Sequence, residues 1–318
     1  MNGYNRRRKY RRGAYRRRHI GTVLITVAAS VVAFLIILLI VGNILHKKSI
    51  ARHTADASSD IPPVSDSAPS TQKRQALQLN GRLCLLRTSD STVFGDRLDR
   101  LLNGGNTHAS VPMNDRSSAS LLYVSDVGQS IGIGSSSDGD LDKAVQSAND
   151  RGMTVSGVYY TSALSIEDPL VRSTELSRDA AIISEILNKG VAEVSVVAPG
   201  MSAEHMDEII EFVSDIHALT ESGAVGITVS EEILTSADAS ALISRLNDGV
   251  DYLCVDLSLC KDTEPYEYID SKINSEYLIY LHMYKMRLLL PYSDNTEAQD
   301  TVIAAATDNG INNWQIIK

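Results

Sequence analysis

From about residue 141 onward, the chain alternates amphipathic segments with short runs that are almost entirely apolar. Residues 179–200 show the pattern clearly, with apolar residues at three- and four-residue spacing before Gly190 and a valine-rich run, 194–198, after it. The spacing predicts a helix with one apolar face, and a glycine is the residue best suited to a left-handed C-cap. A strand without a polar face is typical of a parallel sheet covered by helices on both sides.

The same order of helix, glycine and apolar run recurs at Gly152, Gly223, Gly249 and Gly310. Helices that alternate with parallel strands define an α/β domain. One further helix, 203–219, is strongly amphipathic. The expected strands lie near 82–87, 121–125, 155–160, 194–198, 226–230, 252–257, 287–291 and 314–317.

Eight such strands within roughly 240 residues favour a closed (β/α)8 TIM-like barrel. An open, doubly wound parallel sheet is the alternative, because the first strands of the series are the least regular. We place this domain at residues 79–318.

A second kind of segment precedes the domain. Residues 20–45 contain no charged residue, and at about 1.5 Å per residue a helix of this length crosses a bilayer of roughly 30 Å. A cleaved signal peptide is the rival interpretation, but its apolar region would be about 7–15 residues long with a small-x-small cleavage site. We therefore predict one uncleaved transmembrane helix.

Charge sets the expected orientation of this helix. Nine of the 30 Lys and Arg residues lie within residues 1–19, whereas the whole chain has a formal net charge of -9. The basic cluster predicts a cytoplasmic N-terminus that also contacts anionic lipid heads, with the C-terminal domain extracytoplasmic. Residues 46–78, rich in Ser, Pro, Asp and Ala, are expected to form a disordered stalk.

Composition excludes several other functions. The basic residues of 1–19, with tyrosines among them, could suggest an arm that binds nucleic acid, but next to a membrane helix they are better explained as a topology signal. The rest of the chain is acidic, which makes nucleic acid an unsuitable partner for it. The seven His residues show no metal-ligand spacing, so we expect no metal. The glycines at 132 and 134 lack the third glycine of a dinucleotide loop, so we expect no cofactor. Three cysteines, at 84, 254 and 260, are too few for a disulfide framework.

In a barrel, catalytic groups lie where strands end and βα loops begin. The acidic residues in such positions include Asp126, Glu231, Glu232 and Asp256. Glycoside cleavage commonly uses two carboxyl groups on either side of the scissile bond, and these residues could supply such a pair. Acidic residues at these positions also cap helices, which is the alternative explanation. Tyr160, Tyr292 and Trp314 are the expected sugar-contacting residues.

Three stretches resemble a known family. They are LLYVSDVGQSIGIGSSS (121–137), DLDKAVQSANDRGMTVSGVYY (140–160) and RDAAIISEILNKGVAEVSVVAPG (178–200). The body is similar to the glycoside-hydrolase-like barrel domains of membrane-anchored bacterial envelope proteins. The resemblance carries one acid over, Glu193, as a substrate-binding residue, and the Asp-x-Asp-x-Glu run of chitinase-like barrels is missing.

These observations predict a membrane-anchored, extracytoplasmic glycoside-hydrolase-like barrel that acts on or binds cell-envelope polysaccharide. If it is an enzyme, Glu231 or Glu232 would be the acid and Asp256 or Asp126 its partner. The alternative is a catalytically inactive barrel that serves as a cell-wall binding or scaffold module.

Overall fold

The computed structural model describes residues 73–83, 85, 91–118, 120–135, 139–258 and 265–317. The described residues belong to one compact unit, Ser70–Lys318. The predicted basic tail, the transmembrane helix at 20–45 and the stalk up to residue 72 lie outside the described residues. Within the part that is described, no helix combines the length and apolarity needed to cross a bilayer.

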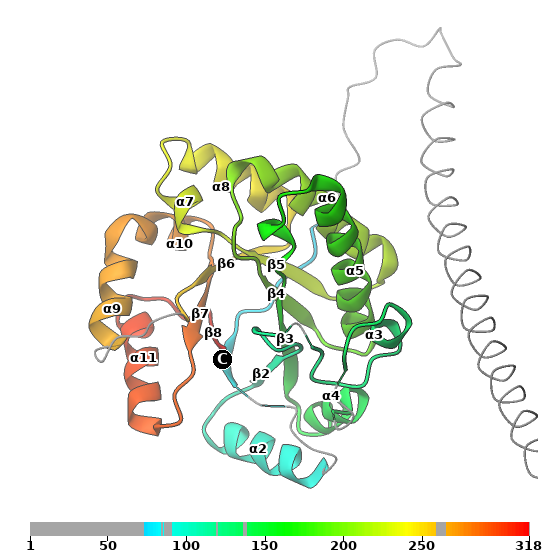
Figure 1. Cartoon of the computed structure of the whole chain (residues 1–318). Coiled ribbons are helices and arrows are strands. Elements are labelled where there is room, and N and C mark those ends of the chain that lie inside the picture. Colours follow the sequence, from blue (N-terminus) through cyan, green and yellow to red (C-terminus); the bar gives the residue numbers. More distant parts are fainter. Residues whose placement is uncertain are drawn as a thin grey trace, which may run out of the picture. The chain divides into compact units, whose positions relative to one another are not determined.

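Eight parallel strands close into a barrel, and each strand pairs with its neighbour in the sequence (Figure 1). The last strand pairs with the first, with Asn80 opposite Trp314 and Gly81 opposite Gln315. The barrel prediction is therefore confirmed, and the open doubly wound sheet is excluded. The strands are β1 (Asn80–Leu83), β2 (His108–Pro112), β3 (Thr154–Tyr160), β4 (Glu193–Val197), β5 (Ala224–Thr228), β6 (Tyr252–Asp256), β7 (Arg287–Pro291) and β8 (Trp314–Ile317).

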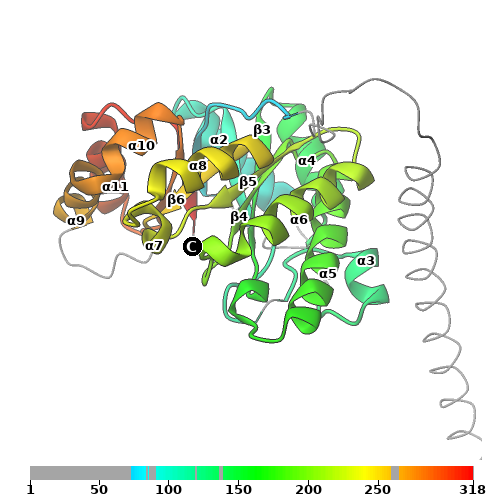
Figure 2. The ribbon, with the colours of Figure 1, turned by 90° about the horizontal axis from the view of Figure 1, so that it is seen from above.

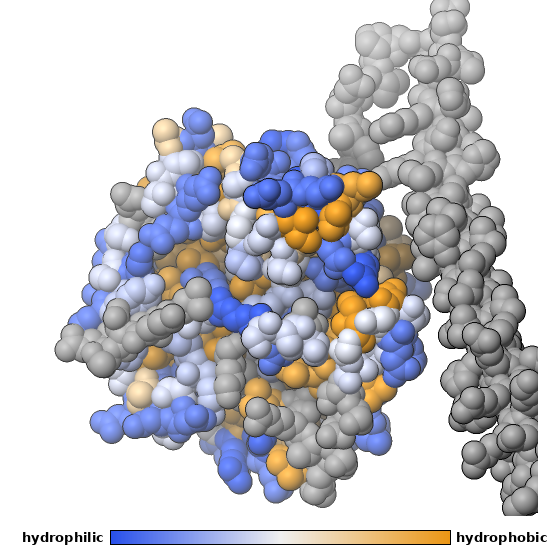
Figure 3. All heavy atoms as spheres, in the orientation of Figure 1, coloured by the Kyte–Doolittle hydropathy of each residue, from blue (hydrophilic) through white to orange (hydrophobic). Residues whose placement is uncertain are grey.

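Helices surround the strands, as the two perpendicular views show (Figures 1 and 2). The α-helices are α2 (Ser91–Asn103), α3 (Asp126–Ser130), α4 (Leu141–Asn149), α5 (Pro169–Asn188), α6 (Met206–Leu219), α7 (Glu231–Leu234), α8 (Ala239–Gly249), α9 (Pro265–Lys272), α10 (Leu278–Met283) and α11 (Thr296–Asp308). Short 3₁₀ turns lie at Ala163–Ser165 and Ala203–His205, and a π-helical turn at Ile273–Tyr277 joins α9 to α10. Hydrophilic side chains cover much of the face shown in Figure 3, and the hydrophobic areas between them are separate from one another.

Three of the five glycines that were expected to end helices do so. Gly152, Gly190 and Gly310 lie one or two residues after the C-caps of α4, α5 and α11, and their φ values of 68°, 90° and 74° are in the left-handed region that favours glycine. Gly223 also has a positive φ, 88°, but α6 ends before it, at Leu219 with Thr220 as the C-cap. Gly249 differs, because it is the last residue of α8 and its φ is not positive. A Cβ at this position would lie 2.5 Å from Ile210, so close packing explains this glycine.

The second strand is not where the sequence analysis placed it. The expected strand at 121–125 is wrong, because Leu121 forms only isolated bridges, with Asn114 and Ser135. The strand is β2, between the expected strands at 82–87 and 121–125, where no strand was predicted. It was missed because Ser110 faces the barrel interior, which leaves only Ala109 and Val111 as apolar residues before Pro112.

Side chains alternate along each strand between two separate environments, as in barrels generally. One set packs against the helices and joins the main hydrophobic core, as Val194, Val196, Leu288 and Leu290 do. The other set points into the barrel. Its apolar members are Val158, Tyr160, Val197, Ala224, Tyr252, Cys254, Leu289 and Ile317. Tyr252 needs the space that Gly226 leaves beside it, since a Cβ on Gly226 would lie 2.0 Å from the ring.

Cys254 is a free, buried thiol inside the barrel. Burial raises its pKa to about 12, so it stays protonated and unreactive at neutral pH. Cys84 and Cys260 lie outside the described residues.

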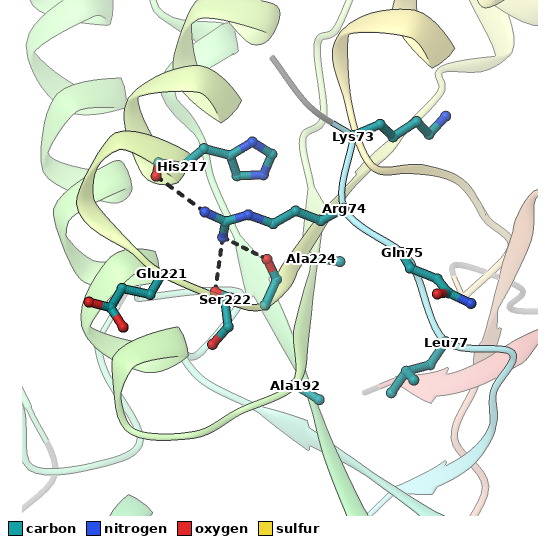
Figure 4. A pocket seen from close by; sticks show the side chains of 10 residues that line it. Lys73, Arg74, Gln75, Leu77, Ala192, His217, Glu221, Ser222 and Ala224 are labelled. Carbon is teal, nitrogen blue, oxygen red and sulfur yellow. Dashed lines mark hydrogen bonds between the residues drawn. The ribbon is translucent and has the colours of Figure 1, made fainter.

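Residues Lys73–Gln78, here called the strap, lie at the amino-terminal end of the barrel, where Leu77 bonds Glu193 and Arg287, the first residues of β4 and β7. Figure 4 shows Lys73, Arg74, Gln75 and Leu77 of the strap beside the pocket that they line. We expected them in the stalk, but Arg74 fastens them to the loop between α6 and β5. Its guanidinium makes five hydrogen bonds of 2.7–3.2 Å to acceptors on His217, Thr220, Ser222 and Gly223. Several of these are carbonyls at or just after the C-terminal end of α6, where the helix dipole favours a cation.

We predict that Arg74→Ala lowers the free energy of unfolding by about 1.5–3 kcal/mol, as expected for lost hydrogen bonds to a charged group. Urea unfolding of the purified chain measures this loss. The matched control is Arg82→Ala, which removes an exposed ion pair with Asp300 at 2.9 Å and should cost less than about 1 kcal/mol. Equal losses in the two variants would show that the strap does not hold the barrel.

Candidate functional site

Two of the predicted site residues meet at the carboxyl-terminal mouth of the barrel. Tyr160 is the last residue of β3, and Asp256 is the last residue of β6. Arg116, in the loop after β2, lies between them. Its guanidinium is 3.4 Å from the Asp256 carboxylate and 5.2 Å from the centre of the Tyr160 ring. We call Arg116, Tyr160, Asp256 and Ser258 the mouth cluster.

Hydrogen bonds fix the members of the mouth cluster. Asp256 accepts from the Ser258 amide at 2.8 Å and from the Ser258 hydroxyl at 2.5 Å, and Arg116 donates to the same hydroxyl at 3.1 Å. Asn114 holds the Tyr160 backbone with two hydrogen bonds of 2.8 Å. Arg116 and Asp256 keep 31% and 16% of their side-chain surface exposed, so a ligand can reach both.

Burial raises the pKa of Tyr160, and the nearby Arg116 guanidinium opposes that shift. The phenol therefore remains neutral and can act only as a neutral hydrogen-bonding and stacking group. The mouth cluster thus contains one carboxylate, one guanidinium, one hydroxyl and one neutral phenol.

Glu231 and Glu232 begin α7 after β5, and both are exposed. Glu231 is paired with Lys272 of α9 at 2.9 Å. Both carboxylates lie in the first turn of the helix, where the dipole favours negative charge, and Ser230 caps that turn. The side chain that caps α7 is therefore that of Ser230, and the two glutamates lie in the first turn without capping it.

Asp126 lies apart from the mouth cluster. It begins the short helix α3, which packs against α5, and its backbone amide donates to Glu185 of α5 at 3.0 Å. Its side chain is exposed on the helical layer. It was predicted as a strand end because 121–125 was interpreted as a strand, and that interpretation is wrong.

The two remaining aromatic candidates have different surroundings. Tyr292 follows β7, is partly exposed, and donates from its hydroxyl to Asp294 at 2.8 Å. That hydrogen bond raises its pKa, with burial as a second cause. Trp314 is the first residue of β8, so it lies at the opposite end of the barrel from the mouth. It is 5% exposed and packs in the core between strands and helices.

Glu193 lies inside the barrel with no exposed surface, in an ion pair with the equally buried Arg287 at 2.5 Å. Each partner makes further contacts. Ser156 and the strap amide of Leu77 donate to Glu193 at 3.1 and 3.0 Å. Arg287 donates to the Leu77 carbonyl at 2.9 Å.

A layer of polar side chains completes this interior network. Ser195 lies within hydrogen-bonding distance of Gln315 and Tyr252, at 2.8 and 3.0 Å. The Arg287 guanidinium stacks 4.2 Å from the centre of the Tyr252 ring. Because these groups satisfy one another at the amino-terminal end of the strands, the structure gives Glu193 a place in the core rather than at a surface a substrate could reach.

A cavity of about 330 Å³ adjoins the mouth cluster and shares Tyr160 with it. Asp179, on α5, lines this cavity. Its carboxylate accepts from the Tyr159 hydroxyl at 2.6 Å and from the Thr161 hydroxyl at 2.5 Å. Burial raises the pKa of Asp179 to about 6, although the two hydroxyl hydrogen bonds act in the opposite direction.

Sequence reasoning missed Arg116, Ser258 and Asp179. Arg116 follows β2, which was not recognised, and Ser258 is an ordinary loop residue. Asp179 lies on a helix, where an acidic residue is normally a solvent-facing one. One signal was present: Asp179 immediately precedes the apolar stretch Ala180–Ile183 and therefore lies close to the buried face of that helix.

The described residues contain no evident metal-binding site. No group of three or more His, Cys, Asp or Glu residues there is arranged to hold an ion.

No protein-family profile matches the chain, and no curated protein sequence matches it. Among solved structures, a protein of Bacteroides thetaiotaomicron assigned as an alpha-L-fucosidase is 12% identical, with a TM-score of 0.53, over 82% of this chain and 91% of that chain. A GH113 beta-1,4-mannanase is 8% identical, with a TM-score of 0.49, over 74% and 86%. The spore cortex-lytic enzyme SleL of Bacillus cereus is 10% identical, with a TM-score of 0.43, over 77% and 71%.

At such identities a structural match concerns the fold alone. The match to the Bacteroides protein supports a (β/α)8 barrel. The chemistry of the site has to be argued from the residues at its mouth.

Trp314 is the only Trp in the chain, so its fluorescence tests where the site lies. We predict that a glycan bound at the mouth leaves the emission maximum unchanged, because Trp314 is buried at the far end of the barrel. Iodide should quench the native chain weakly and the urea-unfolded chain strongly. A shift in emission on adding glycan would place Trp314 at the site after all.

Proposed function

We propose that this protein is a membrane-anchored, extracytoplasmic, glycoside-hydrolase-like barrel that binds cell-envelope polysaccharide at its mouth. The observation that carries the proposal is the mouth cluster, in which Arg116 and Asp256 are fixed side by side and remain partly exposed. Ligand sites of parallel barrels lie at this end of the strands.

The chemistry of the mouth cluster suits a sugar. A carboxylate accepts hydrogen bonds and a guanidinium donates them, so Asp256 and Arg116 together match neighbouring hydroxyl groups of a saccharide. Ser258 adds a hydroxyl group. The Arg116 guanidinium lies over the Tyr160 ring in a cation–π contact. A preorganised polar cluster of this kind loses little entropy when a ligand binds.

The contacts favour binding over cleavage. A glycoside hydrolase generally needs two carboxyl groups, one of which carries a proton. Asp256 is bonded to Arg116, and Glu231 is bonded to Lys272, so each is already paired with a cation. A catalytically inactive barrel that serves as a wall-binding module is therefore the form of the proposal best supported, and hydrolysis by Glu231 or Glu232 with Asp256 is the second candidate.

The sequence supports the location. An uncharged segment, 20–45, follows the basic residues of 1–19, which is the arrangement of a single-pass anchor with a cytoplasmic N-terminus. The basic residues would contact anionic lipid heads, and the barrel would face the envelope polysaccharide.

The test is co-sedimentation of the full-length chain, in detergent, with purified peptidoglycan and other envelope glycans. We predict that Arg116→Ala or Asp256→Asn weakens binding about tenfold, since a hydrogen bond to a charged group contributes about 1.5–3 kcal/mol. The matched control is Arg151→Ala, which removes a surface pair with Asp99 in which Arg151 is 28% exposed, similar to Arg116. That variant should bind normally.

Released reducing ends separate the two candidates. Release that disappears in Glu231→Gln or Glu232→Gln would establish hydrolysis, whereas retention without release establishes binding. Normal retention by both mouth-cluster variants would overturn the proposed site.

A further inference from the structure

The cavity beside the mouth cluster has a chemistry of its own. It lies at the end of β3, between that strand, α5 and the segment that follows β2. Its volume of about 330 Å³ is at the lower end of the range for small-molecule sites. Hydroxyl groups line much of it, from Ser118, Ser120, Thr161 and Ser162, with the Tyr160 ring at the side shared with the mouth.

One carboxylate of this lining, Asp179, makes no ion pair with any residue that the structure describes. Asp179 is 8% exposed, and hydroxyl groups bind both of its oxygens. Arg178 and Glu175 of α5 also line the cavity and act on Asp179 in opposite directions. Arg178 is paired with Glu175 at 2.5 Å and donates to the Ile131 carbonyl at 2.8 Å.

A buried carboxylate without a counter-ion is costly, because burial removes its hydration and hydroxyl groups replace only part of it. The cost shows in the raised pKa of Asp179. A positively charged ligand in the cavity would stabilise the Asp179 carboxylate. Such a ligand must also fit a space that is lined largely by hydroxyl groups.

We propose that this cavity binds an amino-sugar residue with a free primary amine, with the Asp179 carboxylate as the counter-ion of the ammonium group. The serine and threonine hydroxyls would bond the hydroxyls of the sugar. The inference rests on the proposed function and makes it more specific, because the cavity would select glycans in which at least one amino sugar is not N-acetylated.

The pH dependence follows from the groups around Asp179. Tyr159 and Thr161 face it from β3 and the residue after it, and Glu175 and Arg178 face it from α5; Tyr123 acts on Tyr159. Tyr159 stays neutral because burial and Asp179 raise its pKa. The Asp179 carboxylate forms as pH rises through about 6, so ammonium binding should be lost as pH falls through that value.

The experiment compares two probes by calorimetry with the full-length chain in detergent: a glucosamine tetrasaccharide with free amines, and its N-acetylated counterpart. At pH 7 the free-amine probe should bind about tenfold more tightly, and this preference should disappear in Asp179→Asn. Between pH 7 and 5 the affinity for the free-amine probe should fall about tenfold. Asp142→Asn, which removes an exposed carboxylate paired with Lys189, is the control and should keep the preference.

Two measurements keep the test decisive if Asp179→Asn does not fold. The pH profile of the unaltered chain needs no variant. Gly134→Leu adds a side chain to the lining beside Ser120, where a Cβ would have ordinary contact at 3.5 Å, and should weaken the free-amine probe by occupying the cavity. Equal affinity for the two probes, or a preference that survives Asp179→Asn or Gly134→Leu, would overturn the inference.

The outcomes also distinguish this inference from the proposed function. Glycan binding that depends on Arg116 but shows no preference for the free amine would overturn the role of the cavity and leave the mouth cluster in place. If neither probe nor any envelope glycan bound, both would be overturned.

Discussion

The ion pair between Glu193 and Arg287 is the interaction on which the rest of this barrel depends. Both side chains are fully buried, and such a pair is tolerated only when further hydrogen bonds satisfy every remaining donor and acceptor. Ser156 and Ser195 supply two of those hydrogen bonds, and the strap supplies others through Leu77. Gln315 in turn bonds both serines. The amino-terminal end of the barrel is therefore closed by polar contacts that a purely apolar barrel would not need.

This arrangement decides where chemistry can occur. The ion pair and rings such as that of Tyr252 fill the barrel interior, so a ligand site is expected at the carboxyl-terminal side, as in parallel barrels generally. There the strands end in groups that do not need to pack tightly, and Arg116 and Asp256 remain partly exposed. The strap adds a second consequence: the segment that precedes the barrel in the sequence is bound to the end opposite the mouth, which leaves the mouth unobstructed by it.

The fold could be predicted because its signal repeats. The glycines at 152, 190 and 310 follow their helices with positive φ, and the valine-rich strands are covered on both sides. The polar interior was harder to recognise, although it leaves a period-two pattern: Glu193 and Ser195 alternate with valines in β4. In β2, where only Ala109 and Val111 are apolar before Pro112, the same alternation hid the strand itself.

The site could be predicted only as far as it depends on strand ends. Tyr160 and Asp256 were identified because each is the last residue of a strand. Arg116 lies in a loop and Asp179 lies on a helix. Their positions near Tyr160 depend on the tertiary fold and not on a strand end that the sequence pattern can locate. Trp314 and Glu193 were predicted to bind substrate, but each is the first residue of a strand and therefore lies at the end of the barrel opposite the mouth.

A double-mutant cycle on the interior pair tests this account most directly. Urea unfolding would compare Glu193→Gln, Arg287→Met and the double variant. We predict that each single change costs about 3–5 kcal/mol, because it leaves an unpaired charge in the core, and that the double change costs far less than the sum. Small, additive losses of about 1 kcal/mol or less would contradict a barrel built around this pair.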